Sequence, residues 1–189
     1  YIEDIKNVDN NHVFKEGDAD VIIGGPPCQG FSLAGARNRE GFVDDPRNYL
    51  FKHYYNIVKI VKPKIFIMEN VKGLLTMHKG EILRQIISIF ENPENFDGQP
   101  YKIQYKIFNS EDFGIPQKRE RVIIVGTKID FELDKQIEIT KKYIEKEIDV
   151  DFFKKVTIED AISNLPTPTK NGIITGLVSK SKYQMDLSN

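Results

Sequence analysis

One short segment constrains the fold more than any other: an apolar, β-branched run that stops at two glycines and two prolines. Residues 20–24 predict a buried strand, and the sequence Gly24-Gly25-Pro26-Pro27 predicts a rigid loop directly after it. Apolar residues then recur at helical spacing over residues 48–61, and a second apolar run covers residues 64–68. The sequence therefore predicts a parallel strand–helix–strand unit, which is typical of α/β folds.

Two more strands are predicted after a second helix. Helical spacing returns over residues 80–90, whereas residues 101–107 alternate apolar with polar side chains and residues 122–125 form another apolar run. We interpret the last two segments as the final strands, arranged as a hairpin. If the last strand, residues 121–127, runs antiparallel to the first two, its beginning lies at the edge where they end.

The remaining sequence is polar and weakly periodic. Residues 127–155 are rich in Lys and Glu, and we interpret them as a helix or an exposed excursion. Thr157 and Asp160 form a capping-box pattern that opens a short helix, which Pro166 closes. Residues 168–189 have no strong period and predict a linker.

Composition excludes several kinds of site. The 189 residues include a single cysteine, Cys28, which excludes an internal disulfide and every multi-cysteine zinc or iron–sulfur site. The histidines His12, His53 and His78 have no metal-ligand spacing, and we assign no metal. The formal net charge of -1 does not indicate a nucleic-acid partner, so such a partner has to be argued from local motifs.

The lengths of the apolar stretches and the N-terminal sequence indicate the cellular setting. No stretch approaches the roughly 20 apolar residues that cross a bilayer, and the first residues lack the basic and apolar regions of a secretory signal. We therefore expect no membrane span and a reducing, cytoplasmic setting. The chain does not begin with Met and opens in sequence typical of the middle of a domain, as a portion of a longer protein would.

Chemically capable residues fall at the predicted strand ends. Cys28 follows the first strand, and Glu69 ends the second. Before the last strand lie Gln117 and Arg119, and Arg121 begins it. Ligands of open α/β folds bind where the parallel strands end, so we expect these residues to share a crevice. Each alone has a plainer interpretation: a packed thiol, a strand-end carboxylate in water or an exposed charged turn. Their convergence favours a functional site.

Three segments also carry a family resemblance. They resemble, in order and at comparable spacing, the nucleophile loop, catalytic glutamate and paired-arginine motif of the C5-cytosine DNA methyltransferase family. The segments are Gly24-Gly25-Pro26-Pro27-Cys28-Gln29-Gly30-Phe31-Ser32, Glu69-Asn70-Val71 and Gln117-Lys118-Arg119-Glu120-Arg121. Asp4-Ile5 resembles the family's upstream acidic motif, and residues 157–166 resemble the segment leading toward target recognition. The similarity therefore covers most of the chain.

The resemblance implies a fold and an organisation. It implies an α/β, Rossmann-like S-adenosylmethionine-dependent methyltransferase fold, with a mostly parallel sheet and a terminal antiparallel strand. Residues 1–165 would form a partial catalytic domain, and residues 166–189 a linker toward a target-recognition region absent from this sequence. The family's glycine-rich cofactor loop is absent as well, so S-adenosylmethionine would bind here without its main loop.

The resemblance also assigns catalytic roles. Cys28 would be the nucleophile, because a thiolate adds to carbon 6 of cytosine, activates carbon 5 and leaves again by elimination. Glu69 would donate to nitrogen 3 of the base, which requires it to be protonated when the base binds and therefore buried. Arg121 would hold the cytosine O2, while Arg119 would orient Glu69 and favour the Cys28 thiolate.

Binding roles follow from the resemblance in the same way. Four residues would contact S-adenosylmethionine: Asp4, Ile5, Pro27 and Leu50. Four others would lie on the substrate side: Gln29, Ser32, Asn70 and Gln117. Asp4 would meet the cofactor adenine, and Asn70 is expected to brace the Cys28 loop rather than to react.

The implied substrate is double-stranded DNA, with the target cytosine flipped out of the helix, and the implied system partner is a cognate restriction endonuclease. Three other interpretations stay open. An RNA cytosine-5 methyltransferase shares the scaffold, a catalytically silent relative would only bind DNA or a partner enzyme, and a plain α/β domain would simply pack Cys28. The intact Cys28, Glu69, Arg119 and Arg121 argue against the silent relative.

Overall fold

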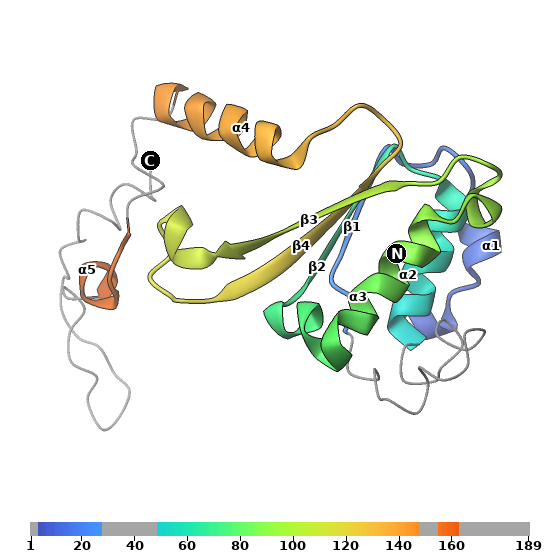
Figure 1. Cartoon of the computed structure of the whole chain (residues 1–189), viewed down its shortest axis with the longest axis horizontal. Coiled ribbons are helices and arrows are strands. Elements are labelled where there is room, and N and C mark those ends of the chain that lie inside the picture. The colour runs from blue at the N-terminus through green and yellow to red at the C-terminus, as the bar shows by residue number, and fades with distance from the viewer. Residues whose placement is uncertain (1–3, 28–48, 148–154, 163–189) are drawn as a thin grey trace, which may run out of the picture. The chain divides into compact units, whose positions relative to one another are not determined.

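The computed structural model describes residues 4–27, 49–147 and 155–162 (Figure 1). Its α-helices and strands are α1 (Asn10–Val13), β1 (Val21–Gly24), α2 (Tyr49–Val61), β2 (Ile65–Val71), α3 (Glu81–Glu91), β3 (Lys102–Asn109), β4 (Glu120–Thr127), α4 (Leu133–Glu147) and α5 (Ile158–Ile162). Short 3₁₀ helices accompany them: η1 (Ile5–Asn7), η3 (Lys72–Leu75), η4 (Met77–Gly80), η5 (Pro93–Phe96) and η6 (Ser110–Phe113). The α/β class predicted from the sequence is confirmed.

The chain divides into two compact units. The first contains residues 1–107 and 121–136, and the second contains residues 108–120 and 137–189. The first unit holds β1, β2, the helices α1 to α3 and most of β3 and β4. The second unit holds the loop end of the β3–β4 segment and α5.

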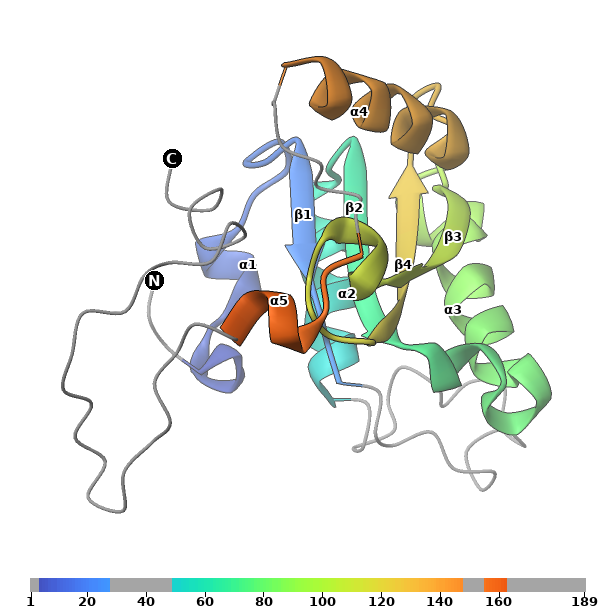
Figure 2. The ribbon, with the colours of Figure 1, turned by 90° about the vertical axis from the view of Figure 1, so that its left-hand side faces the viewer.

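The four strands form one mixed sheet in the order β1-β2-β4-β3 (Figure 2). β1 runs parallel to β2, with Val21 opposite Ile65. β4 runs antiparallel to β2, with Val71 opposite Arg121. The predicted parallel strand–helix–strand unit and the antiparallel last strand are therefore confirmed. Because of these directions, the ends of β1 and β2 and the beginning of β4 lie at the same edge.

Helices α2 and α3 cover one face of the sheet (Figures 1 and 2). Side chains alternate along β2, so that Phe66 and Met68 point into this layer and are fully buried. The ring of Phe66 lies 4.3 Å from that of Phe90 and 5.0 Å from that of Tyr101, centroid to centroid. This aromatic cluster is the centre of the core and holds β2 in place under the helices.

The opposite face of β1 differs from the expectation of a buried strand. Ile23 is 73% exposed and Val21 is 48% exposed. The prediction of a buried strand is therefore wrong for β1 as described. The reason is that α2 and α3 cover one face, whereas a parallel strand is buried on both sides only when helices cover both faces of the sheet.

The C-terminal segments are also helical where described. The charged segment after β4 contains α4, as one of the two interpretations predicted. The predicted capping box at α5 is confirmed: the Thr157 N–H and Oγ1 bond to Asp160 Oδ2 at 2.9 and 2.7 Å, and the Asp160 N–H donates to Thr157 Oγ1 at 3.1 Å. Pro166, predicted to close this helix, lies outside the described residues.

Packing across β2 and β4 predicts that replacing one glycine destabilises the core. Gly126 lies opposite Phe66, and a Cβ at this position would meet the Phe66 ring at 2.1 Å. We expect Gly126→Ala to lower the free energy of unfolding, measured by urea denaturation, by about 1–3 kcal/mol because it overpacks the core. Gly73→Ala is the matched control, since a Cβ there meets nothing within 4 Å. Equal losses in the two variants would contradict this account of the core.

Candidate functional site

β1 ends in the Gly-Gly-Pro-Pro loop, which approaches two neighbouring side chains closely. A Cβ at Gly24 would lie 2.6 Å from Tyr54 Cε2, and a Cβ at Gly25 would lie 3.2 Å from Glu69 Oε2. The Tyr54 hydroxyl donates to the Ile67 carbonyl at 2.9 Å, and burial raises the pKa of this phenol, so it remains a donor. Two glycines therefore let the loop sit directly against α2 and β2.

A carboxylate–guanidinium pair joins β2 to β4 beside this loop. Val71 lies opposite Arg121, so Glu69, two residues earlier on β2, shares a face with Arg121 and lies diagonally across from it. Arg121 Nε is 2.7 Å from Glu69 Oε1, the distance of a charge-assisted hydrogen bond. Since Oε2 lies next to Gly25, the carboxylate is held between the loop after β1 and the beginning of β4.

The environment of Glu69 differs from the expectation in one respect. The sequence predicted a buried, protonated Glu69, but its side chain is 44% exposed. The side chain is not buried in this structure because Glu69 lies on the face of β2 opposite the core, and its role as a donor to the bound base stays a prediction.

Asn70 lies on the core face of β2 and is buried. Its Nδ2 donates to the Pro26 carbonyl at 3.0 Å, and its Oδ1 accepts from the Val71 N–H at 2.9 Å. Because both ends of the amide are engaged, its orientation is fixed by these bonds. The side chain thus ties the loop after β1 to β2, two residues before Cys28.

The structure brings together parts of all three sequence motifs at one edge of the sheet (Figure 2). The residues concerned are Gly25, Pro26, Glu69, Asn70 and Arg121. Cys28, Gln29 and Ser32 lie outside the described residues, since this loop is described only as far as Pro27. The geometry therefore covers the approach to Cys28 and leaves its role a prediction.

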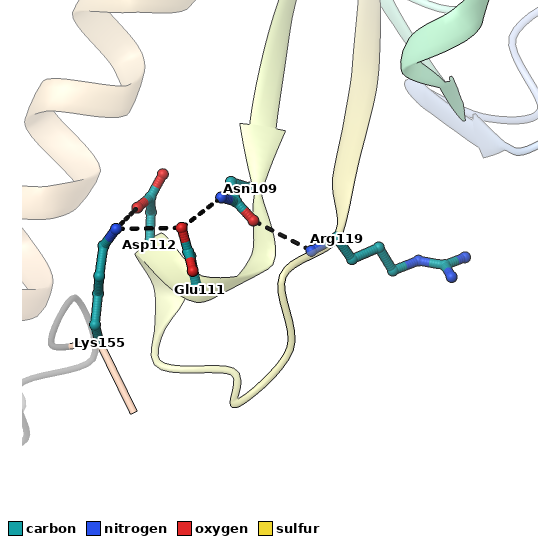
Figure 3. Close-up of polar contacts among 5 residues, drawn as sticks. All are labelled: Asn109, Glu111, Asp112, Arg119 and Lys155. Carbon is teal, nitrogen blue, oxygen red and sulfur yellow. Dashed lines mark hydrogen bonds and ion pairs between the residues drawn. The ribbon is translucent and has the colours of Figure 1, made fainter. Parts of the chain in front are cut away.

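Gln117 and Arg119 belong to the second unit, in the loop that precedes β4, and both are exposed. The backbone of Arg119 is bonded to Asn109 and Ser110, and its guanidinium extends away from Asn109 (Figure 3). Neither Asn109 nor Ser110 was predicted from the sequence as a site residue. The available signal was their position at the end of a strand, because Asn and Ser side chains bond the backbone of nearby turns.

The residues predicted to contact S-adenosylmethionine lie in the first unit. The Asp4 carboxylate accepts from the Lys6 N–H at 3.0 Å and caps η1, which contacts α2. Leu50, in the first turn of α2, is partly buried, and Pro27 is exposed. An exposed carboxylate can accept from the amino group of an adenine, and apolar side chains suit its ring. The chemistry of these residues therefore fits the cofactor.

Within residues 4–27, 49–147 and 155–162, no three His, Cys, Asp or Glu side chains come close enough to hold a metal ion. His53 instead shares a hydrogen bond of 3.2 Å with Asn10. No described helix is both long and apolar enough to cross a membrane.

Comparison with known proteins places the chain among DNA methylases. The family model of C-5 cytosine-specific DNA methylases matches residues 1–189. The chain is 39% identical over 173 residues to Type II methyltransferase M.AquIA of Picosynechococcus sp., a match that covers 87% of this chain. It is 48% identical over 109 residues to Type II methyltransferase M1.HphI of Haemophilus parahaemolyticus, a match that covers 58% of this chain.

The relatives are longer than this chain. The matches span 67% of M.AquIA and 27% of M1.HphI. Among solved structures, the S. pombe Dnmt2 methyltransferase is similar with a TM-score of 0.48 and 22% identity, over 74% of this chain and 40% of that chain.

The bonds of Asn70 predict a loss of stability on truncation. We expect Asn70→Ala to lower the free energy of unfolding by about 1–3 kcal/mol, because the Pro26 carbonyl and the Val71 N–H both lose a partner. Urea denaturation measures the change. Asn11→Ala, at an exposed position, serves as the control and should stay within about 0.5 kcal/mol of the original chain. An unchanged free energy of unfolding in Asn70→Ala would show that the Asn70 hydrogen bonds do not contribute to stability.

Proposed function

The chain belongs to the C-5 cytosine-specific DNA methylase family, and on that premise we propose that it is the catalytic part of a DNA (cytosine-5)-methyltransferase. The proposed reaction moves a methyl group from S-adenosylmethionine to carbon 5 of cytosine in double-stranded DNA. One observation supports this most directly: the Glu69 carboxylate is held between Arg121 and the Gly25 backbone. An acid–base group and a cation thus lie beside the loop that leads into Cys28.

Cys28 supplies the nucleophile in this proposal. Its thiolate adds to carbon 6 of the cytosine, and the electron pair of the 5,6 double bond shifts so that carbon 5 becomes the nucleophilic carbon of an enamine. Cys28 is the chain's single cysteine. The two prolines before Cys28 stiffen the approach to it, and Asn70 ties the first of them, Pro26, to β2.

Glu69 and Arg121 stabilise the negative charge that develops on the base. Addition at carbon 6 places negative charge on the pyrimidine ring, which a donor at nitrogen 3 stabilises. When the base enters, Arg121 moves its hydrogen bond from Glu69 to the cytosine O2. The carboxyl group of Glu69 is then free to hold the proton that nitrogen 3 needs. The ion pair is in this way the resting arrangement of the site.

The later steps restore both the base and the enzyme. Asp4, Ile5, Pro27 and Leu50 would hold S-adenosylmethionine, whose sulfonium would supply the methyl group for carbon 5 and leave as the thioether S-adenosylhomocysteine. A water molecule takes the proton from carbon 5, which re-forms the 5,6 double bond and expels the Cys28 thiolate, and nitrogen 3 returns its proton to Glu69. The thiolate is therefore regenerated without any redox change.

Duplex DNA hides carbons 5 and 6 of a stacked cytosine, so the proposal includes flipping of the target base out of the helix. Gln29, Ser32 and Gln117 contact the DNA or fill the space near the flipped base. In the proposed organisation, residues 1–165 belong to the catalytic domain and residues 166–189 lead toward a target-recognition region. Because its relatives are named Type II methyltransferases, we extend to this protein a cognate restriction endonuclease as its system partner.

A methyl-transfer assay tests the proposal. The full-length protein is incubated with duplex DNA and S-adenosylmethionine carrying a tritiated methyl group, and 5-methylcytosine is quantified. We expect Cys28→Ser to abolish transfer and Glu69→Gln to lower kcat by about 100-fold or more, because it removes a proton-transfer group. Lys142→Ala, which breaks an exposed ion pair with Glu138 on α4, should leave kcat unchanged.

The same assay includes two RNA substrates, a single-stranded RNA and a transfer RNA, as alternatives to DNA. Methylation of RNA and not of DNA would overturn the proposed substrate. Full activity of Cys28→Ser would overturn the proposed mechanism.

A further inference from the structure

The end of β3 holds the backbone of Arg119 at both of its polar groups. The Arg119 N–H donates to Asn109 Oδ1 at 3.2 Å (Figure 3). The Arg119 carbonyl accepts from the Ser110 N–H and from Ser110 Oγ, each at 3.0 Å. These bonds form where the strand pair opens into a loop, and all of these residues lie in the second unit. The hydrogen bonds of Asn109 and Ser110 therefore fix the backbone of Arg119 where strand pairing ends.

The amide of Asn109 is itself oriented by a carboxylate. Asn109 Nδ2 donates to Glu111 Oε1 at 2.7 Å. An amide that donates on one side presents its oxygen to the other, which here is the Arg119 N–H (Figure 3). Glu111 Oε1 also lies 3.2 Å from Lys155 Nζ, and this ammonium lies 3.8 Å from Asp112 as well. The direction of the Asn109 oxygen thus follows from its neighbours.

The loop that these bonds close is exposed. It turns at Gly114, where φ is 71°, and Ile115, Gln117 and Lys118 are exposed. Arg119 follows, directly before β4. A long side chain at the end of an exposed loop is directed only as well as its Cα is held, because its own bonds rotate freely. Asn109 and Ser110 provide that hold.

We propose that Asn109 is a positioning residue for methyl transfer, which acts by fixing the backbone of Arg119. This inference rests on the proposed function and on the catalytic role that the family resemblance assigns to Arg119. Misplacement of a catalytic group by about 1 Å can cost on the order of 100-fold in rate. Loss of one of three bonds to the Arg119 backbone should lower kcat by about tenfold.

Exchanging the amide at position 109 with the carboxylate at position 111 tests the hydrogen bonds to Arg119 without removing them. In Asn109→Asp the carboxylate still accepts from Arg119 but repels Glu111, so we expect kcat for DNA methylation by the full-length protein to fall about tenfold at unchanged KM. In Asn109→Asp/Glu111→Gln the new amide donates to the new carboxylate, and both bonds are restored at the same net charge. We expect this double variant to recover to within about threefold of the original kcat.

A second measurement distinguishes positioning from a general structural role. Asn109→Ala is compared in the original protein and in an Arg119→Ala background. We expect it to lower kcat in the first and to have no further effect in the second, because it acts through Arg119. Asn95→Ala is the control, since it removes a similar side-chain bond to the Ile89 carbonyl, at 3.0 Å. Its kcat should be unchanged in either background.

Three results would overturn the inference: an active Asn109→Ala, an equal loss in the Arg119→Ala background, or a double variant no better than Asn109→Asp. The proposed function fails differently. In that case the original protein transfers no methyl group to DNA, and the inference that rests on it falls with it.

Discussion

The ion pair between Glu69 and Arg121 is the contact that joins the parts of this site. It forms because β4 runs antiparallel to β2 with Val71 opposite Arg121, which places Glu69 and Arg121 diagonally on one face. A shift of the register by one residue would turn one of the two side chains toward the core. The aromatic cluster around Phe66 fixes that register from the opposite face. Core packing and site geometry are therefore set by the same two strands.

Close backbone approach completes the arrangement. Gly24 lets the loop after β1 lie against Tyr54, and Gly25 leaves room for the Glu69 carboxylate. Asn70 then fastens the next residue, Pro26, to β2. The segment leading into Cys28 is thus held by contacts on both faces of β2, which is the kind of support that a nucleophile needs for a fixed direction of attack.

Much of this could be predicted from the sequence, because it depends on local patterns. Helical spacing identified α2 and α3, and the position of polar residues at strand ends indicated which edge carries the candidate site. The exposure of Ile23 and Glu69 could not be predicted, since it depends on which face the helices cover. The bond from Asn109 to Arg119 was equally hidden, because it joins residues ten positions apart across a loop.

The central claim is that the edge built by Glu69, Asn70 and Arg121 serves a covalent attack by Cys28 on cytosine. Duplex DNA carrying 5-fluorocytosine tests it most directly, because fluorine blocks the final elimination and traps the adduct. The account predicts a protein–DNA adduct that needs S-adenosylmethionine, maps to Cys28 by mass spectrometry and is lost in Cys28→Ser. Methylation of ordinary cytosine by the same protein, with no adduct or with one at another residue, would contradict it.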